Sequence, residues 1–275
     1  MPVSATDDDA LFVLTAAMLT PAQFPSVLAD DYPAACAELG LEAITDGYGL
    51  IFGQDGTGAR WTVAVNDTAL VACALAAWDC GLEYDLSPDE HSVIAALPGW
   101  PLPVAVAAPG VAAPHDPDEK EAGRPLSPPD SDHWGPAQRR MGADEIALQW
   151  RTWREQLGEP AGSGGTDGER AAEDRATEPG TATGGGLHPG VRRALAAAQE
   201  YVNTPPPPGR IRSTSAGEGV RTLRVDGTDW SLVARTDDVA FVLLDDEPGE
   251  VLPVGRGPEL PKLLEALDQL AVRPS

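Results

Sequence analysis

Basic residues are scarce in this chain, and their scarcity limits the ligands that it could bind directly. The 275 residues include 19 Lys and Arg against 43 Asp and Glu, which gives a formal net charge of −24. The first 110 residues hold one base, Arg60, among 15 acids, whereas residues 187–275 hold 10 bases and 13 acids. Because an acidic surface repels phosphate backbones, the composition argues against nucleic acid and is compatible with a basic protein partner. Solubility alone would also explain the acidity.

Cysteine and long apolar runs are also rare. Cys36, Cys73 and Cys80 form an odd-numbered set, and no Cys or His pairs stand at zinc-ligand spacing. The longest apolar run, residues 69–78, is about half of what a membrane-spanning helix needs. The first ten residues are acidic, unlike a secretory signal. We therefore expect a cytoplasmic protein without disulfide framework, structural zinc or membrane span.

Motifs that carry catalysis are missing as well. The segment GQDGTG at residues 53–58 lacks the lysine and helix that complete a phosphate-binding loop, and it is typical of a hairpin turn. The histidines are dispersed at His91, His115, His133 and His188, and the acidic runs are adjacent residues rather than spaced metal ligands. The sequence thus predicts no catalytic residue, no cofactor and no metal.

A long middle segment is rich in Pro, Gly, Ser and Asp. Residues 103–187 lose the hydrophobic periodicity of the flanking chain. Such a composition buries too little apolar surface to offset the entropy lost on ordering. We therefore expect a largely disordered linker between two folded domains, at residues 10–102 and 188–272.

The two flanking segments repeat one order of local signals. Each contains a Pro-initiated helix, a strand that opens in Trp after an Asp-Gly turn, and a second Pro-initiated helix. The paired landmarks are Pro21 and Pro189, Trp61 and Trp230, and Pro88 and Pro258. Their spacings of 168, 169 and 170 residues agree closely. The pattern predicts an α+β fold of two similar α-β-β-β-β-α modules, each an antiparallel sheet with helices on one face. Both Trp residues are expected in the core, although they could instead line a groove.

One part of the middle segment, residues 143–157, has the pattern of a helix. A single apolar stripe joins Ile146, Trp150, Trp153 and Leu157 at helical spacing. Such a helix either docks on the protein's own modules, covering an open sheet face or edge, or binds a partner, because Trp and Arg dominate interface hot spots. These four residues are therefore the candidate partner-binding site.

The sequence favours a non-catalytic cytoplasmic protein-binding function, of the adaptor, secretion-chaperone or immunity type. The alternative is a small-ligand-binding regulatory protein with its site between the modules, and the third is an enzyme of unrecognised type. An exposed apolar groove would favour the first reading, an apolar cleft between modules the second, and a pocket of paired acids with shifted pKa values the third.

Overall fold

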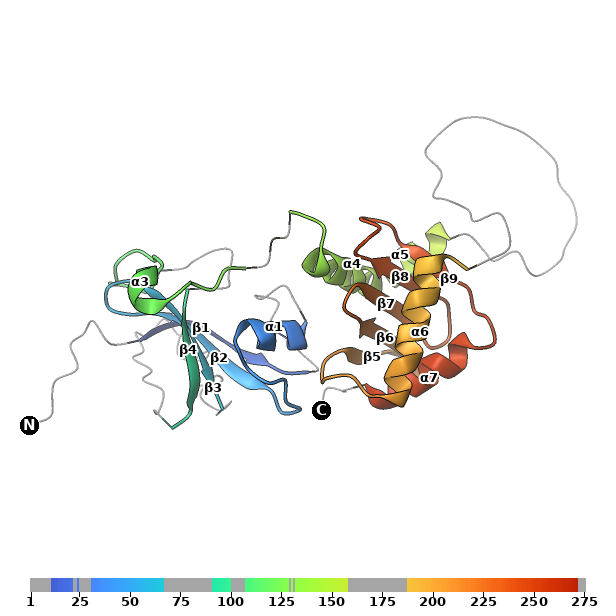
Figure 1. Cartoon of the computed structure of the whole chain (residues 1–275), viewed down its shortest axis with the longest axis horizontal. Helices are drawn as coiled ribbons and strands as arrows, with labels where there is room; N and C mark the ends of the chain where they lie inside the picture. Colours follow the sequence, from blue (N-terminus) through green and yellow to red (C-terminus); the bar gives the residue numbers. More distant parts are fainter. Residues whose placement is uncertain are drawn as a thin grey trace, which may run out of the picture.

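Two antiparallel sheets form the body of the protein. The computed structural model describes residues 11–21, 24, 31–66, 91–99, 107–128, 130, 132–157 and 187–271 (Figure 1). One sheet has four strands and the other has five, and in both the strands follow one another in chain order. This arrangement confirms the predicted α+β class with antiparallel sheets.

The first sheet contains a helix within its strand sequence. Its elements are β1 (Phe12–Leu19), α1 (Tyr32–Glu38), β2 (Tyr48–Gln54), β3 (Arg60–Val65) and β4 (Val93–Pro98). The turn between β2 and β3 is the predicted hairpin: Asp55 Oδ1 accepts hydrogen bonds from the backbone N–H groups of Thr57 and Ala59. Side chains of β2 are buried on both faces of the sheet, Leu50 and Phe52 on one and Ile51 on the other.

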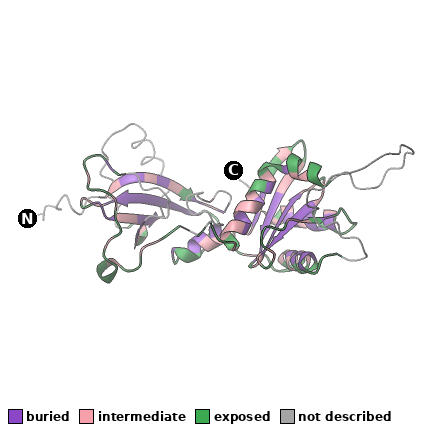
Figure 2. Cartoon of the chain, turned by 90° about the horizontal axis from the view of Figure 1, so that it is seen from above, coloured by how far each residue is buried: buried purple, intermediate pink, exposed green. Residues whose placement is uncertain are grey.

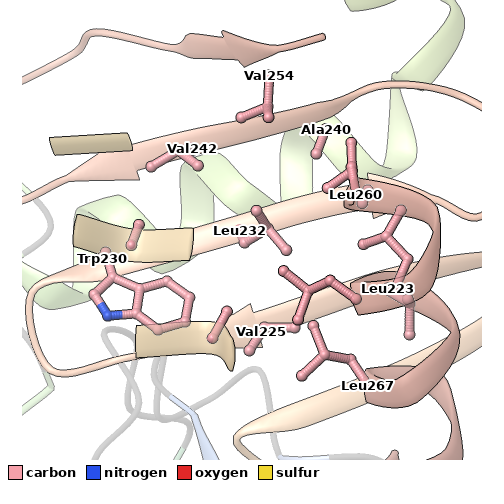
Figure 3. Packing of buried hydrophobic residues seen from close by; sticks show 14 of the residues in the cluster. Leu223, Val225, Trp230, Leu232, Ala240, Val242, Val254, Leu260 and Leu267 are labelled. Atoms are coloured by element: carbon pink, nitrogen blue, oxygen red, sulfur yellow. The ribbon is translucent and has the colours of Figure 1, made fainter. Parts of the chain in front are cut away.

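The second sheet is covered on one face by two amphipathic helices. The strands are β5 (Ile211–Gly217), β6 (Val220–Asp226), β7 (Trp230–Arg235), β8 (Ala240–Leu244) and β9 (Leu252–Val254), and the helices are α6 (Pro189–Asn203) and α7 (Leu260–Leu270). Leu260 and Leu267 of α7 lie in one core cluster with Leu223 and Leu232 of the sheet (Figure 3). Trp230 is buried in this core, as expected, and its ring lies beside Tyr201.

The opposite face of the second sheet is covered as well, so the prediction of helices on one face is wrong here. Helices α4 (Pro136–Leu148) and α5 (Trp150–Gln156) pack on it, against Val233, Phe241 and Leu243. Every residue of β8 is buried, and Figure 2 shows that buried residues are concentrated on the strands of the sheets. A strand with apolar side chains at successive positions must be covered on both faces of the sheet. A strand in which apolar and polar side chains alternate must be covered on one face only.

The element order also differs from the predicted α-β-β-β-β-α in both halves. In the first, α1 lies between two strands, and in the second, five strands rather than four lie between the helices. Pro88 lies outside the described residues. Trp61 is the second residue of β3 and Trp230 the first residue of β7, each in the third strand of its sheet after an Asp-Gly turn. The hairpin is therefore common to both halves, and duplication stays a prediction.

Much of the expected linker has defined structure, which corrects the prediction for residues 107–128, 130 and 132–142. In its first part, which includes the short helix α3 (Glu119–Ala122), parallel bridges join Ala59 to His115 and Gly99 to Leu126. The buried Gln54 side chain accepts a 2.8 Å hydrogen bond from the backbone N–H of Ala108. The second part forms α4 and α5. The helix predicted at residues 143–157 is divided between the end of α4 and α5. Backbone bridges and buried polar contacts order such a segment without hydrophobic periodicity. Residues 158–186 lie outside the described part.

No helix in the described ranges is long and apolar enough to cross a membrane.

Candidate functional site

The four candidate partner-binding residues lie on α4 and α5 or directly after them. Ile146 is buried, and Trp150, only 7% exposed, meets the Phe241 ring edge-on at a centroid distance of 5.2 Å. Trp153 packs on the same ring at 6.5 Å, whereas Leu157 follows α5 and is exposed. The stripe predicted from the sequence is therefore the face by which this helical segment contacts the sheet.

Polar contacts fix α5 in the same position. Trp150 Nε1 donates to Asp238 Oδ2 at 3.3 Å, and Arg154 Nε donates to Asp238 Oδ1 at 2.9 Å. Burial acts to raise the pKa of Asp238, but these donors and the Val239 N–H outweigh it and lower the pKa. The structure thus matches the internal-docking alternative, and partner binding by the stripe of Ile146, Trp150, Trp153 and Leu157 stays a prediction.

A buried group of charged residues joins the two halves of the protein. We call it the junction cluster. It comprises Asp31, Arg139, Arg140, Asp144, Arg210, Arg212, Arg224, Asp226 and Asp245. Asp31 comes from the first half, Arg139, Arg140 and Asp144 from α4, and the others from or beside the second sheet. The sequence analysis missed this cluster because its members are spread over more than 200 residues of chain.

Asp31 is the contribution of the first half to the junction cluster. Its side chain is fully buried and caps α1, since Oδ1 accepts a 2.9 Å hydrogen bond from Ala34 N–H. Oδ2 lies 2.7 Å from Arg210 Nη1 and 3.0 Å from Arg140 Nε. Burial raises the pKa of Asp31 despite the opposing effect of Arg210. Next to this contact, Gly209 packs on Tyr32.

Asp226 occupies the centre of the cluster. It is fully buried, accepts a 2.6 Å hydrogen bond from Ser231 Oγ, and lies 3.3 Å from Arg212 Nη2 and 3.2 Å from Arg224 Nε. Burial alone would raise its pKa, but the two guanidinium groups outweigh burial and hold the pKa at about 2. Burial acts in the other direction on Arg212, lowering its pKa to about 10. The fully buried Arg139 bonds to Ser231 and to Asp245.

One sequence signal could have revealed the cluster. Arg212 and Arg224 are directly opposite each other on neighbouring strands. Like charges in that position repel unless acids neutralise them, so the pair requires buried carboxylates nearby. Asp226 supplies one of them, two residues along the same strand.

The acids of the cluster are engaged by the arginines around them. The described residues include no group of three or more His, Cys, Asp or Glu able to hold a metal ion. The thiol of Cys36 is buried on α1, which raises its pKa to about 11. At neutral pH this thiol stays protonated and is a poor nucleophile.

An open apolar groove lies on the other side of the second sheet, between α6, α7 and the end of β9. Its volume is about 490 Å³. Apolar side chains from both helices line it, including Leu195, Ala196, Leu260 and Leu263, and Glu259 is the one charged residue among those that line it in the described part of the chain. Leu187, just before α6, lies at its edge and is 43% exposed.

Comparison with protein-family models, with curated proteins and with solved structures gives no match for this chain. The functional inference therefore depends on the residues of these two features.

Proposed function

We propose that this chain is a non-catalytic cytoplasmic protein-binding protein, and that the groove between α6 and α7 receives an apolar segment of a basic partner. The observation that carries the proposal is the groove itself: an open, apolar depression in the surface of a sheet-and-helix body. Concave, mostly apolar depressions of this kind are the usual places at which proteins bind a ligand.

The dimensions of the groove suit protein side chains. A volume of about 490 Å³ is enough for a few large apolar side chains, and lies within the range of roughly 300–1,000 Å³ that is usual for binding pockets. Two helices with a groove between them are also the typical receptor for an amphipathic segment. The exposed Leu187 and Ala196 would lose contact with water when the segment binds.

Charge specifies the kind of partner. The chain carries a net charge of −24, and Glu259 is the charged residue at the groove. Such a field accelerates the approach of positive proteins and slows that of negative ones. The proposed partner therefore presents an apolar segment that is flanked by Lys or Arg.

Photo-crosslinking from a single position in the native cytoplasm tests the proposal. Ala196 is exposed in the groove, whereas Ala37 is exposed on α1 and serves as the matched control. A benzophenone side chain at each position, in turn, would be irradiated in cells and the adducts identified by mass spectrometry. We expect a protein that is captured from position 196, is not captured from position 37, and has Lys or Arg beside the crosslinked apolar residues.

Three results would overturn the proposal. They are equal capture from both positions, no capture from position 196, and capture only of a second copy of this chain. The last result would assign the groove to self-association, and the oligomeric state measured by light scattering would confirm it.

A further inference from the structure

Two arginines of the junction cluster have buried N–H groups that no acceptor in the described part of the chain satisfies. The side chain of Arg224 is 5% exposed, and its Nη2 and Nε form no hydrogen bond, nor does the buried Nε of Arg212. Arg224 Nε does lie 3.2 Å from Asp226 Oδ2, but the pair lacks hydrogen-bond geometry. A buried donor without an acceptor is costly, and more so when it carries charge.

The other nitrogens of the same two side chains show which ligand they prefer. Arg224 Nη1 donates to the carboxylate of Asp144, and Arg212 Nη2 lies 3.3 Å from the carboxylate of Asp226. Asp144 is 44% exposed, so this carboxylate reaches the arginine pair from the solvent side. The pair is therefore already a carboxylate receptor, with donors to spare.

The balance of charge also favours an anion. Among the described residues, the cluster contains five arginines and four aspartates, so one positive charge is not matched. The ring of Phe24 lies 4.2 Å from the guanidinium carbon of Arg212 and 5.9 Å from that of Arg224. An aromatic ring on one side holds the guanidinium plane but supplies no acceptor to its edge, where the N–H groups point.

We propose that the junction cluster is a binding site for a small oxyanion, a phosphate or a carboxylate, held by the free N–H groups of Arg224 and Arg212 beside Phe24. Guanidinium groups bind such oxygens through charge-assisted hydrogen bonds, often in pairs. The ligand would supply the acceptors that the N–H groups lack and neutralise the unmatched charge. This site is separate from the α6–α7 groove and does not depend on the proposed partner binding.

Titration of the full chain with inorganic phosphate, acetate and chloride tests the site. Chloride at matched ionic strength controls for general salt effects, and comparison of phosphate with acetate distinguishes the two sources of an oxyanion. We expect a saturable rise in the melting temperature with one of the oxyanions and none with chloride. Isothermal titration calorimetry gives the dissociation constant directly.

Two lysine variants locate the site. Arg212→Lys keeps the charge but removes Nε and the planar fork, and we expect the oxyanion to bind about tenfold more weakly or worse. Arg212 lies nearer the edge of the cluster than Arg224, so its variant tests the site even if Arg224→Lys does not fold. Arg235→Lys changes an arginine that pairs with Asp237 outside the cluster, and should bind as the wild type does.

The proposal is wrong if neither oxyanion stabilises the wild type beyond the effect of chloride. It is also wrong if an oxyanion binds with the same affinity to Arg212→Lys and to Arg235→Lys, because the ligand would then bind elsewhere.

Discussion

Asp226 shows how a single buried carboxylate can organise positive charge from several elements. Two arginines from neighbouring strands contact it, and Ser231 links it to Arg139 of α4. A buried ion pair contributes little compared with apolar packing, but removing one partner leaves an uncompensated charge and is strongly destabilising. The Asp226 carboxylate is therefore needed to neutralise the buried arginines around it.

We predict that Asp226→Asn lowers the free energy of unfolding at pH 7 by about 3–5 kcal/mol, as measured by urea unfolding. Because the folded pKa of Asp226 is about 2, below its ordinary 3.8, its contribution is present above about pH 4 and is lost as the pH falls towards about 2. The wild type should therefore lose about 2 kcal/mol more than the variant over that interval.

Asp31, whose pKa is raised by burial and by the charge of Asp226, contributes with the opposite sign. Because Asp226→Asn removes part of that effect, the contribution of Asp31 is larger in the wild type and reduces the difference between the two proteins. Equal loss of stability in the two proteins between pH 4 and pH 2 would contradict the assigned ion pairs.

At the scale of elements, β7 and β8 determine the layering of the second half. Their residues are buried on both faces, so α6 and α7 cover one face and α4 and α5 the other. The α4–α5 segment thus contributes to stability as a core element. The face of the second sheet that α4 and α5 cover has charged side chains on β5 and β6 and apolar side chains on β7 and β8.

We predict that Trp150→Ala lowers the free energy of unfolding by about 3–5 kcal/mol, because a large side chain is removed from a packed core and its contact with Phe241 is lost. Leu148→Ala, two residues earlier at the end of α4, is the control. Its side chain is 86% exposed, and we expect a change of less than about 0.5 kcal/mol. Chemical unfolding followed by circular dichroism measures both. Similar effects of the two substitutions would show that α5 does not dock on the sheet.

The sequence predicted the elements whose signal is local. The hairpin at Asp55 and the Pro-initiated start of α6 both follow from residues close together in the chain. The helices on the opposite face of the second sheet were predicted only as one of two alternatives for residues 143–157, because no local signal distinguishes docking on the protein itself from docking on a partner.

The junction cluster could not be predicted from local patterns, because it depends on pairing between distant residues. The arginines of α4 lie in a segment whose composition predicted disorder, and Asp31 appeared only as one of several acidic runs. Tertiary contacts decide the structure of such residues. The groove was equally hidden, since it depends on the spacing between α6 and α7 rather than on either helix alone.

At the scale of the whole molecule, Gly209 lies where the two halves meet. Its φ is +91°, and a Cβ there would lie 2.8 Å from Tyr32 Cβ and 3.2 Å from Pro33 Cδ. Gly219, in the turn between β5 and β6, has a φ of +70° with nothing within 4 Å of such a Cβ. An alanine at Gly219 would therefore introduce backbone strain alone, whereas an alanine at Gly209 would introduce backbone strain and a steric clash between the two halves.

We predict that Gly219→Ala lowers the free energy of unfolding by about 1 kcal/mol from strain alone, and that Gly209→Ala lowers it by a further 1–3 kcal/mol or so. Amide hydrogen exchange in α1 should accelerate in Gly209→Ala and stay unchanged in Gly219→Ala, because only the former glycine touches Tyr32. If exchange in α1 is unchanged in both variants, Gly209 does not contribute to the junction.

The central claim is that the α6–α7 groove binds a partner segment, and the affinity of a groove-filling variant tests it most directly. The protein that crosslinking identifies as the partner is purified on its own. It is then titrated by calorimetry into the wild type, Ala196→Trp and Ala37→Trp. Because the new indole occupies the groove, Ala196→Trp should bind at least about tenfold more weakly, a loss of about 1.4 kcal/mol, while Ala37→Trp binds as the wild type does. Wild-type affinity in Ala196→Trp would contradict the account.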